Sequence, residues 1–332
     1  MVRILKATPE AVAEGARLLR EGKLVAFPTE TVYGLGADAF NPLAVARIFE
    51  VKNRPEFDPI IVHVADPAQL PELGREIPGT ARRLMEKFWP GPLTLILPKT
   101  EKVPDIVTAG LPTVAVRMPA HPVALALIRA AGRPVAAPSA NPFGYLSPTT
   151  AEHVLAQLDG KVDLILDGGP CPVGVESTVL DLTADVPTVL RPGGLAVEDI
   201  EAVIGPVRVA AGPADRPRSP GQLARHYSPR TPLVLFNDQA YPDPGGRRAG
   251  LLLFRRPHRV PEGFAAVEWL SETGDLREAA ANLFAALHRL DRAHLDIIFA
   301  ERVPEVGLGR AIMDRLRKAA APTVDGPDPL TG

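Results

Sequence analysis

The feature that most restricts how this chain can fold is the alternation of helical and extended patterns through its first two hundred residues. Residues 9–22 repeat apolar side chains at helical spacing, with Val12, Ala16 and Leu19 on one face. Residues 23–28 then form a short apolar run that ends at a proline. Strands interleaved with helices exclude all-α and all-β folds, so the sequence predicts an α/β protein.

The sheet of this protein is expected to be mixed. Residues 93–98 and 113–118 both have extended apolar patterns, and no long helix is predicted between them. Two strands that follow each other without a crossover helix favour an antiparallel pair inside the sheet. Further helices are expected after two capping sites, Asn41-Pro42 and Thr150.

A segment rich in proline, glycine and arginine, residues 211–231, breaks this alternation. It has almost no aliphatic periodicity, which is typical of an interdomain linker. Extended patterns and two helical patterns, near 275–292 and 308–320, predict a second and smaller α/β unit after it. We therefore expect a first domain over 1–205, a linker over 206–231 and a second domain over 232–332.

Composition restricts the classes of function. The formal net charge is −2, which argues mildly against a standing nucleic-acid binder because such proteins usually carry a basic surplus. No run of eighteen apolar residues exists, and the first ten residues lack the apolar region of a signal peptide. Cys171 is the one cysteine, which excludes an internal disulfide, and no Cys/His cluster has zinc-ligand spacing. We expect a cytoplasmic protein without a membrane span.

The first polar cluster follows a predicted strand. Residues 29–31 supply two hydroxyls and a carboxylate, and Gly34 and Gly36 permit positive φ or a close backbone approach. Hydroxyls and backbone N–H groups at a strand end suit a small polar ligand, although a decorated turn explains them equally well. The chain has no Walker A pattern and no GxGxxG pattern, which excludes an ordinary P-loop or Rossmann phosphate site.

The second cluster contains two cations, Lys52 and Arg54, after a predicted helix. They either interact with the helix dipole or clamp a triphosphate. His63 lies in an apolar run predicted to be a buried strand, where a hydrogen-bonded core histidine is the more common occurrence.

Further candidates lie in or beside later strands. Thr113, Ala115 and Arg117 share one strand face, and a buried Arg117 needs a carboxylate, either from the protein or from a substrate. The other clusters contain Ser139, Asn141, Ser177, Thr178 and Arg191. The set includes no nucleophile–base pair, no metal ligands and no flavin or nicotinamide motif. It suits the binding and alignment of a nucleotide and a small amino or carboxylic acid.

Several motifs occur together in a fixed order: "PTETVYGLG", "K-x-R-P" with "P-x-I-V-H-V", "S-A-N" followed by "S-P-T", "E-S-T-V-x-D" and "R-P-G". In this set the chain resembles the threonylcarbamoyl-AMP synthases, the YrdC-domain family. The tail, with "SPG-x4-HYSP" and a second α/β unit, resembles the long two-domain form of that family.

The resemblance implies a twisted mixed sheet around a large basic cavity, with a smaller Rossmann-like domain after it. It implies a nucleotidyltransferase that converts ATP, L-threonine and bicarbonate to threonylcarbamoyl-AMP, pyrophosphate and water. This is the first step of threonylcarbamoyladenosine modification of tRNA, which other proteins complete. Mg²⁺ would be carried mainly by ATP, with no metal site of the protein's own and no stable nucleic-acid complex.

The resemblance also assigns residues. Thr31, His63, Arg117 and Ser177 would surround threonine. Lys52 and Arg54 would be catalytic and, with Asp58, Thr113, Ser139, Asn141, Arg191 and Tyr227, would line the ATP site. The linker would fold over the active site and carry Arg225, His226 and Tyr227.

Two positions depart from the family pattern. Asp58 replaces a common asparagine, and "QLAR" replaces a different stretch in the linker, which leaves the contacts of Gln222 and Leu223 open.

An RNA-binding module is the alternative from another class of function, and the net charge opposes it. The related carbamoyltransferases of hydrogenase maturation carry zinc fingers, which one cysteine cannot form.

Overall fold

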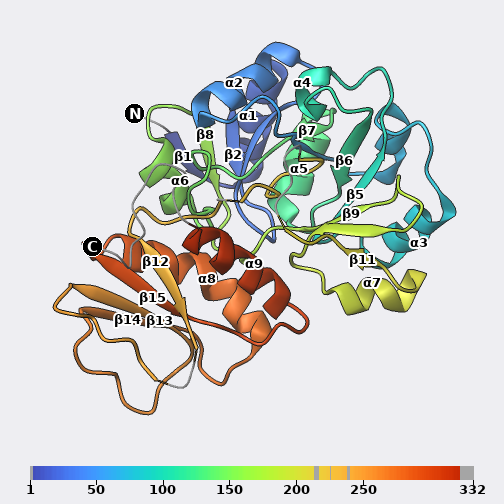
Figure 1. The fold of residues 1–332 in the computed structure, drawn as a ribbon. Coiled ribbons are helices and arrows are strands. Elements are labelled where there is room, and N and C mark those ends of the chain that lie inside the picture. Colours follow the sequence, from blue (N-terminus) through green and yellow to red (C-terminus); the bar gives the residue numbers. More distant parts are fainter. Residues whose placement is uncertain (1–2, 213–216, 225, 238–239, 322–332) are drawn as a thin grey trace. The chain divides into compact units, whose positions relative to one another are not determined.

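The computed structural model describes residues 3–212, 217–224, 226–237 and 240–321 (Figure 1). The chain divides into two compact units, Met1–Phe143 with Ser147–Leu223, and Gly144–Leu146 with Ala224–Gly332. The short piece Gly144–Leu146 joins the second unit because the Ser228 N–H donates to the Gly144 carbonyl oxygen at 2.8 Å. The division falls inside the predicted linker.

The first unit is a mixed sheet covered by helices. Its described strands are β1 (Arg3–Lys6), β2 (Val25–Phe27), β3 (Gly34–Asp38), β4 (Ile61–His63), β5 (Leu93–Pro98), β6 (Thr113–Arg117), β7 (Val135–Ala136), β8 (Leu164–Asp167), β9 (Thr178–Asp181), β10 (Thr188–Arg191) and β11 (Arg208–Val209). Their order is β1-β8-β2-β3-β7-β4-β6-β5-β9-β10-β11. The helical segments are α1 (Pro9–Arg20), α2 (Pro42–Lys52), the 3-10 segment η1 (Pro67–Glu72), α3 (Gly79–Phe88), α4 (Asp105–Thr108), α5 (Pro122–Ala131), α6 (Ala151–Leu158) and α7 (Val197–Ile204).

The predicted helix caps are confirmed. The Asn41 side chain accepts hydrogen bonds from the backbone N–H groups of Leu43 and Ala44, and Pro42 opens α2. The Thr150 side chain accepts from the His153 N–H at the start of α6. These side chains satisfy backbone donors that the first helical turn leaves without partners.

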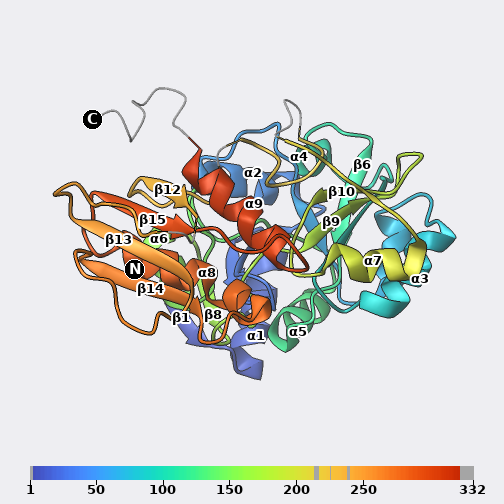
Figure 2. The ribbon, with the colours of Figure 1, turned by 60° about the horizontal axis from the view of Figure 1, so that its bottom comes forward.

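Alternate residues at strand β2 enter different apolar cores. Leu24 and Ala26 belong to one core, whereas Val25 and Phe27 belong to a second core, with α1 and α5. Helices α1 and α5 lie side by side in Figure 2, as α3 and α7 do in both ribbon views. The sheet is therefore buried from both faces along β2.

The mixed sheet is confirmed by its pairing. Strand β5 pairs with β6 in the antiparallel sense, as the sequence predicts, while β4 pairs with β6 in the parallel sense. On the face that carries Ala115, the apolar cluster is small and consists of the strand residues Ile61, Ile96, Ala115 and Val179, with Leu190 against it. This face has room for polar side chains.

Of the two roles predicted for Gly34 and Gly36, positive φ is wrong, whereas a close approach to the backbone is confirmed at Gly36. Both lie within strand β3, and neither has positive φ. A Cβ atom at Gly36 would meet Phe27 Cε1 at 2.8 Å and Val135 Cγ1 at 2.9 Å. Glycine is needed here because neighbouring side chains pack directly on the strand, and this packing hid β3 from the strand pattern.

The second unit contains a parallel sheet, as expected for a smaller Rossmann-like domain. Its described strands are β12 (Leu233–Phe236), β13 (Ala249–Arg255), β14 (Ala266–Ser271) and β15 (Ile297–Glu301), in the order β12-β15-β13-β14. Its described helices are α8 (Leu276–Asp291) and α9 (Gly309–Ala320), close to the two predicted ranges. The sequence did not reveal β14.

In the described part of the chain, no helix is both long and apolar enough to cross a membrane.

Candidate active site

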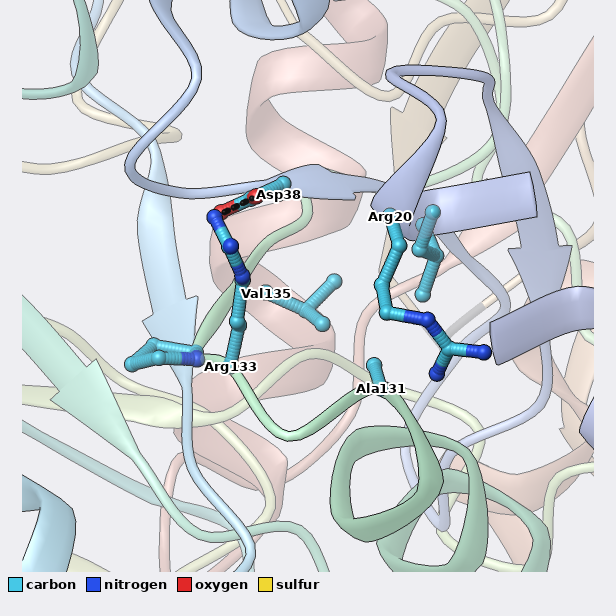
Figure 3. Close-up of a pocket in the computed structure, with 7 residues that line it drawn as sticks. Arg20, Asp38, Ala131, Arg133 and Val135 are labelled. Atoms are coloured by element: carbon cyan, nitrogen blue, oxygen red, sulfur yellow. Dashed lines mark hydrogen bonds and ion pairs between the residues drawn. The ribbon is translucent and has the colours of Figure 1, made fainter. Parts of the chain in front are cut away.

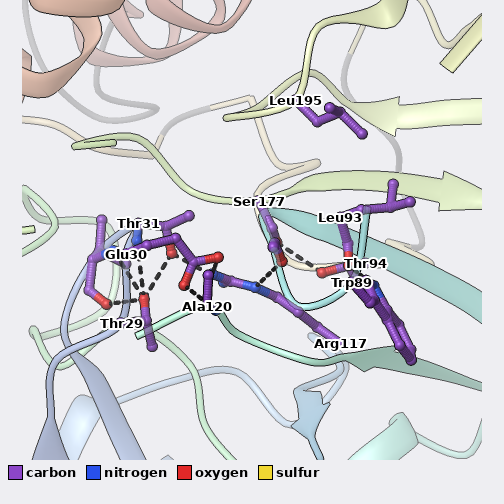
Figure 4. A network of polar contacts seen from close by, with 12 residues as sticks. Thr29, Glu30, Thr31, Trp89, Leu93, Thr94, Arg117, Ala120, Ser177 and Leu195 are labelled. Atoms are coloured by element: carbon purple, nitrogen blue, oxygen red, sulfur yellow. Dashed lines mark hydrogen bonds and ion pairs between the residues drawn. The ribbon is translucent and has the colours of Figure 1, made fainter. Parts of the chain in front are cut away.

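Strand register brings three polar residues into one row. His63 on β4 and Thr94 on β5 are both register partners of Arg117 on β6. Directly paired residues point to the same face of a sheet, so the three side chains lie next to one another on the face described above. Figure 4 shows Arg117 and Thr94 within a network of polar contacts that also includes Glu30, Thr31 and Ser177.

Arg117 is buried and has a carboxylate partner within the protein. Its Nη2 lies 2.6 Å from Glu30 Oε1, its Nη1 donates to Thr31 Oγ1 at 2.9 Å and its Nε donates to the Gly91 carbonyl oxygen. The second oxygen of Glu30 accepts from the Ala120 N–H at 2.9 Å. Of the two partners that the sequence left open, the structure therefore places a protein carboxylate, Glu30, against Arg117.

His63 is held neutral. Burial, together with the positive charge of Arg117, lowers the pKa of His63 to about 3. The Phe27 ring meets it edge-on, with 6.4 Å between the ring centroids. A neutral imidazole beside a guanidinium can orient a polar ligand without adding a second positive charge.

Arg191 connects Ser177 with the segment that follows the first sheet. Its Nη2 donates to the Ser177 carbonyl oxygen at 2.9 Å and to Ser177 Oγ at 3.2 Å, and its Nη1 donates to the Pro220 carbonyl oxygen. Ser177 Oγ also shares a hydrogen bond of 2.7 Å with Thr94 Oγ1. The hydroxyl row and the buried arginine thus form one network.

Gly193 in the "RPGG" stretch allows this arrangement. A Cβ atom at that position would lie 2.3 Å from the Glu176 carbonyl oxygen and 2.4 Å from the Thr178 backbone nitrogen. Backbone cannot move aside as a flexible side chain can, so the two segments approach this closely only through a glycine.

Lys52 is a buried cation that fastens a loop. Its Nζ donates to the backbone carbonyl oxygens of Ser139, at 2.6 Å, and Asn141. Burial, followed by the positive charge of Arg54, holds the pKa of Lys52 well below its usual range, while Asp58 acts in the opposite direction. At 2% exposure, Lys52 is not a solvated cation at a helix end.

Arg54 and Asp58 form a buried ion pair, with 2.9 Å between Nη2 and Oδ2. The guanidinium also donates to the backbone carbonyl oxygens of Asp58 and Pro59. Burial raises the pKa of Asp58, while the positive charges of Arg54, Lys52 and Arg191 act to lower it. Asp58 therefore lies among three cations and is paired with one of them.

The other residues assigned to the ATP site lie on two segments of the first unit. Thr113 begins β6, and Ser139 forms an isolated bridge with Gly34 of β3. Asn141 is buried and its Nδ2 donates to the Pro142 carbonyl oxygen. The sequence left the contacts of Gln222 in the linker open. In the structure, Gln222 Oε1 accepts hydrogen bonds from the backbone N–H groups of Arg218 and Ser219.

Tyr227 belongs to the second unit. Its backbone is in the left-handed region, with φ of 60°, and its ring is buried against Phe284 of α8. The Arg315 guanidinium carbon of α9 lies 4.8 Å from the ring centroid, a cation–π contact. Its predicted position at the nucleotide stays a prediction, and Arg225 lies outside the described residues.

Sequence patterns did not single out Thr94, and they gave Glu30 no role in this network. Thr94 lies in the apolar run 93–98, where alternation places Leu93, Leu95 and Leu97 on the core face and Thr94 on the opposite face. That signal was present in the sequence. The contact of Glu30 with Arg117 joins residues 87 positions apart, and no local pattern reveals it.

The fold and site together define a class: an α/β protein whose sheet carries buried hydroxyls, a neutral histidine and several cations close together on one face. Residues 17–193 match the family model described as telomere recombination, that of the Sua5, YciO and YrdC proteins. Residues 195–321 match the model of the threonylcarbamoyl-AMP synthase C-terminal domain. The chain therefore belongs to the threonylcarbamoyl-AMP synthase family, a family of nucleotidyl-transferring enzymes, as its motifs suggested.

Individual relatives agree over nearly the whole chain. The threonylcarbamoyl-AMP synthase of Bacillus subtilis is 49% identical over 95% of this chain and 94% of its own length. That of Pyrococcus abyssi is also 49% identical, over 92% of each chain. The crystal structure of P. abyssi Sua5 with L-threonine aligns with a TM-score of 0.88 and 45% identity, over 96% of this chain and 97% of that one. These matches confirm the predicted fold.

Proposed function

We propose that this protein makes threonylcarbamoyl-AMP and pyrophosphate from ATP, L-threonine and bicarbonate. The product would supply the threonylcarbamoyl group for modification of adenosine in tRNA, with the transfer left to other proteins. The observation that carries the proposal is the position of Arg191. Arg191 donates a hydrogen bond to Ser177 Oγ, which connects it to the polar residues beside Arg117. Its positive charge, like those of Lys52 and Arg54, also acts to lower the pKa of Asp58.

The two linked clusters match the two substrates. The row of Thr31, His63, Arg117 and Ser177 offers hydroxyls, a neutral imidazole and one guanidinium, which suit a hydroxylated amino acid. Lys52, Arg54 and Arg191 offer buried positive charge, which suits a triphosphate. Thr113, Ser139 and Asn141 would complete the ATP side.

The chemistry needs alignment more than covalent help from the protein. The threonine amine attacks bicarbonate to give an N-carboxylate, and a carboxylate oxygen then attacks the α-phosphorus while pyrophosphate leaves. Fixed cations neutralise charge that develops on the phosphates, and a rigid site holds three reactants in line. Among the described residues, no group of three or more acidic, histidine or cysteine side chains is placed to hold a metal ion, so Mg²⁺ would arrive with ATP.

Pyrophosphate release is the direct test. We expect release from ATP only when both L-threonine and bicarbonate are present, with serine a poor substitute in a panel of amino acids. A threonine-independent release, or equal rates with several amino acids, contradicts the proposal.

A further inference from the structure

Three buried polar atoms lie at or beside Arg117 and have no hydrogen-bond partner of good geometry within the described part of the chain. They are Glu30 Oε1, Arg117 Nη2 and His63 Nδ1. The three residues are 6%, 3% and 4% exposed, so water does not freely reach them. Glu30 Oε1 and Arg117 Nη2 are 2.6 Å apart as an ion pair, but neither forms a hydrogen bond of good geometry with the other. Buried polar atoms of this kind are costly unless a ligand pairs with them.

An anionic acceptor beside a cationic donor is complementary to a zwitterion. The α-carboxylate of an amino acid would meet Arg117, and its ammonium group would meet the carboxylate oxygen of Glu30. Glu30 is rigid enough for this task because its other oxygen is fixed by the Ala120 N–H. Simple acids, which lack the ammonium group, would leave Glu30 Oε1 with the Arg117 ion pair but without a hydrogen-bond donor of good geometry.

We propose that Glu30 is a catalytic residue that binds the ammonium group of the amino acid and accepts the proton that must leave it. This inference rests on the proposed function and adds to it a residue that neither the motifs nor the expected site had assigned.

The proton balance of the first step requires such an acceptor. An ammonium and a bicarbonate give an N-carboxylate, one water and one proton. The Glu30 carboxylate first accepts one proton from the ammonium and becomes a neutral acid, which leaves a lone pair on the nitrogen. That lone pair forms the new N–C bond, the C–OH bond of bicarbonate breaks, and a second nitrogen proton leaves with the hydroxyl as water.

The test variant is Glu30→Gln, which keeps the shape and an acceptor oxygen but cannot take the proton. The chain offers a matched control in Asp38→Asn. Asp38 is also buried, pairs with Arg133 at 2.9 Å and accepts from the Phe40 N–H, and it lines a small crevice with Arg20 and Ala131 (Figure 3). In the strand register, Val135 separates it from His63, so its own ion pair is formed away from Glu30 and Arg117. Both variants remove one buried negative charge beside an arginine.

For Glu30→Gln we expect kcat to fall by about 100-fold or more, the usual contribution of a general base, and the KM for threonine to rise by about 10-fold because the ammonium group loses its charged partner. Asp38→Asn should keep the wild-type kcat. A near-wild-type kcat in Glu30→Gln, or an equal fall in both variants, overturns the role of Glu30. A wild-type protein that releases no pyrophosphate with threonine and bicarbonate contradicts the proposed function instead.

Binding measurements on the wild-type protein keep the inference testable even if Glu30→Gln does not fold. Calorimetry compares L-threonine with 3-hydroxybutyrate, which has the carboxylate and hydroxyl but no amine. We expect threonine to bind about 10- to 100-fold more tightly, as for one hydrogen bond to a charged group. Equal affinities overturn the inference, and in a folded Glu30→Gln protein the preference should shrink to a few-fold.

Discussion

The Arg54 guanidinium and the Asp58 carboxylate form a buried ion pair, with 2.9 Å between Nη2 and Oδ2. An anion beside phosphates is unfavourable unless a cation meets it. Arg54 is that cation. The same side chain is fastened to the backbone carbonyl oxygens of residues 58 and 59, so its position does not depend on the Asp58 carboxylate alone.

Asp58→Asn should tighten ATP binding. The substitution removes a negative charge from among three cations but leaves the carbonyl contacts of Arg54 in place. We expect about a tenfold lower Kd for ATP, an effect of one nearby charge at the effective dielectric of a protein. Calorimetry can measure this, with Asp163→Asn, a carboxylate paired with Arg47 elsewhere in the first unit, as the control. Weaker ATP binding in Asp58→Asn would show instead that the carboxylate has a positive role.

Lys52→Met should abolish most turnover while the fold persists. Methionine has a similar length without an ammonium group, and its cost in stability is the lost donor to the carbonyl oxygens of Ser139 and Asn141, about 1–3 kcal/mol for each acceptor left without a partner. We expect turnover to fall by about 10²- to 10³-fold, as for loss of one electrostatic stabiliser. Lys99→Met, at a lysine paired with Asp105, is the control. A near-wild-type rate would mean that Lys52 only fastens the loop at Ser139 and Asn141.

Arg117→Ala should weaken threonine binding by about 2–4 kcal/mol, the range for removal of one partner of a buried charge pair. ATP affinity should change less. Because Ala also leaves Glu30 without its cation, Arg117→Lys is a necessary companion, and it should restore part of the lost thermal stability but little of the threonine affinity. Threonine affinity that is unchanged in both variants excludes Arg117 from the carboxylate site.

The sequence predicted this site in parts and not as a whole. Strand alternation placed Arg117 with Thr113 and Ala115 on one face, and capping residues marked the starts of α2 and α6. The partner of Arg117 and the place of Thr94 depend on register between strands, which tertiary packing determines. Strand β3 was missed because its glycines reflect packing by Phe27 and Val135 rather than a turn.

The stability of the protein should fall between pH 6.5 and pH 5, and His63 should be a main cause. Burial lowers the pKa of His63 to about 3, whereas the unfolded chain titrates near 6.5. Below pH 6.5 the unfolded state therefore binds a proton that the native state does not, and the free energy of unfolding decreases as pH falls toward 3. Between pH 6.5 and pH 5 the loss is about 2 kcal/mol.

A variant isolates this contribution. Denaturant unfolding at several pH values should show a weaker pH dependence in His63→Gln than in the wild-type protein between pH 6.5 and pH 5. Carboxylates titrate mostly below this window and should affect both proteins alike. Parallel curves for the two proteins would mean that His63 is protonated in the native state.

The last prediction concerns the segment 217–223, which the first unit holds by specific contacts. Arg218 Nη1 lies 2.6 Å from the buried Asp181 carboxylate and Nη2 donates to Thr183 Oγ1, while Arg191 donates to the Pro220 carbonyl oxygen. A plain solvated tether needs none of these contacts. Since Arg191 also bonds to Ser177, the segment is fastened to a residue of the proposed site, and we propose that it covers that site and excludes water from the mixed anhydride product.

Arg218→Ala should loosen this cover without harming the fold. Because its guanidinium is 41% exposed, the ion pair contributes at most about 1 kcal/mol, so we expect no more than about a fivefold loss of product yield per pyrophosphate released. The ratio of threonylcarbamoyl-AMP to pyrophosphate, followed by chromatography, separates a leaking site from a slow one. Arg208→Ala removes an exposed arginine on β11 and should leave the ratio unchanged. If the ratio in Arg218→Ala equals that of the wild-type protein, the segment serves only to connect the two units.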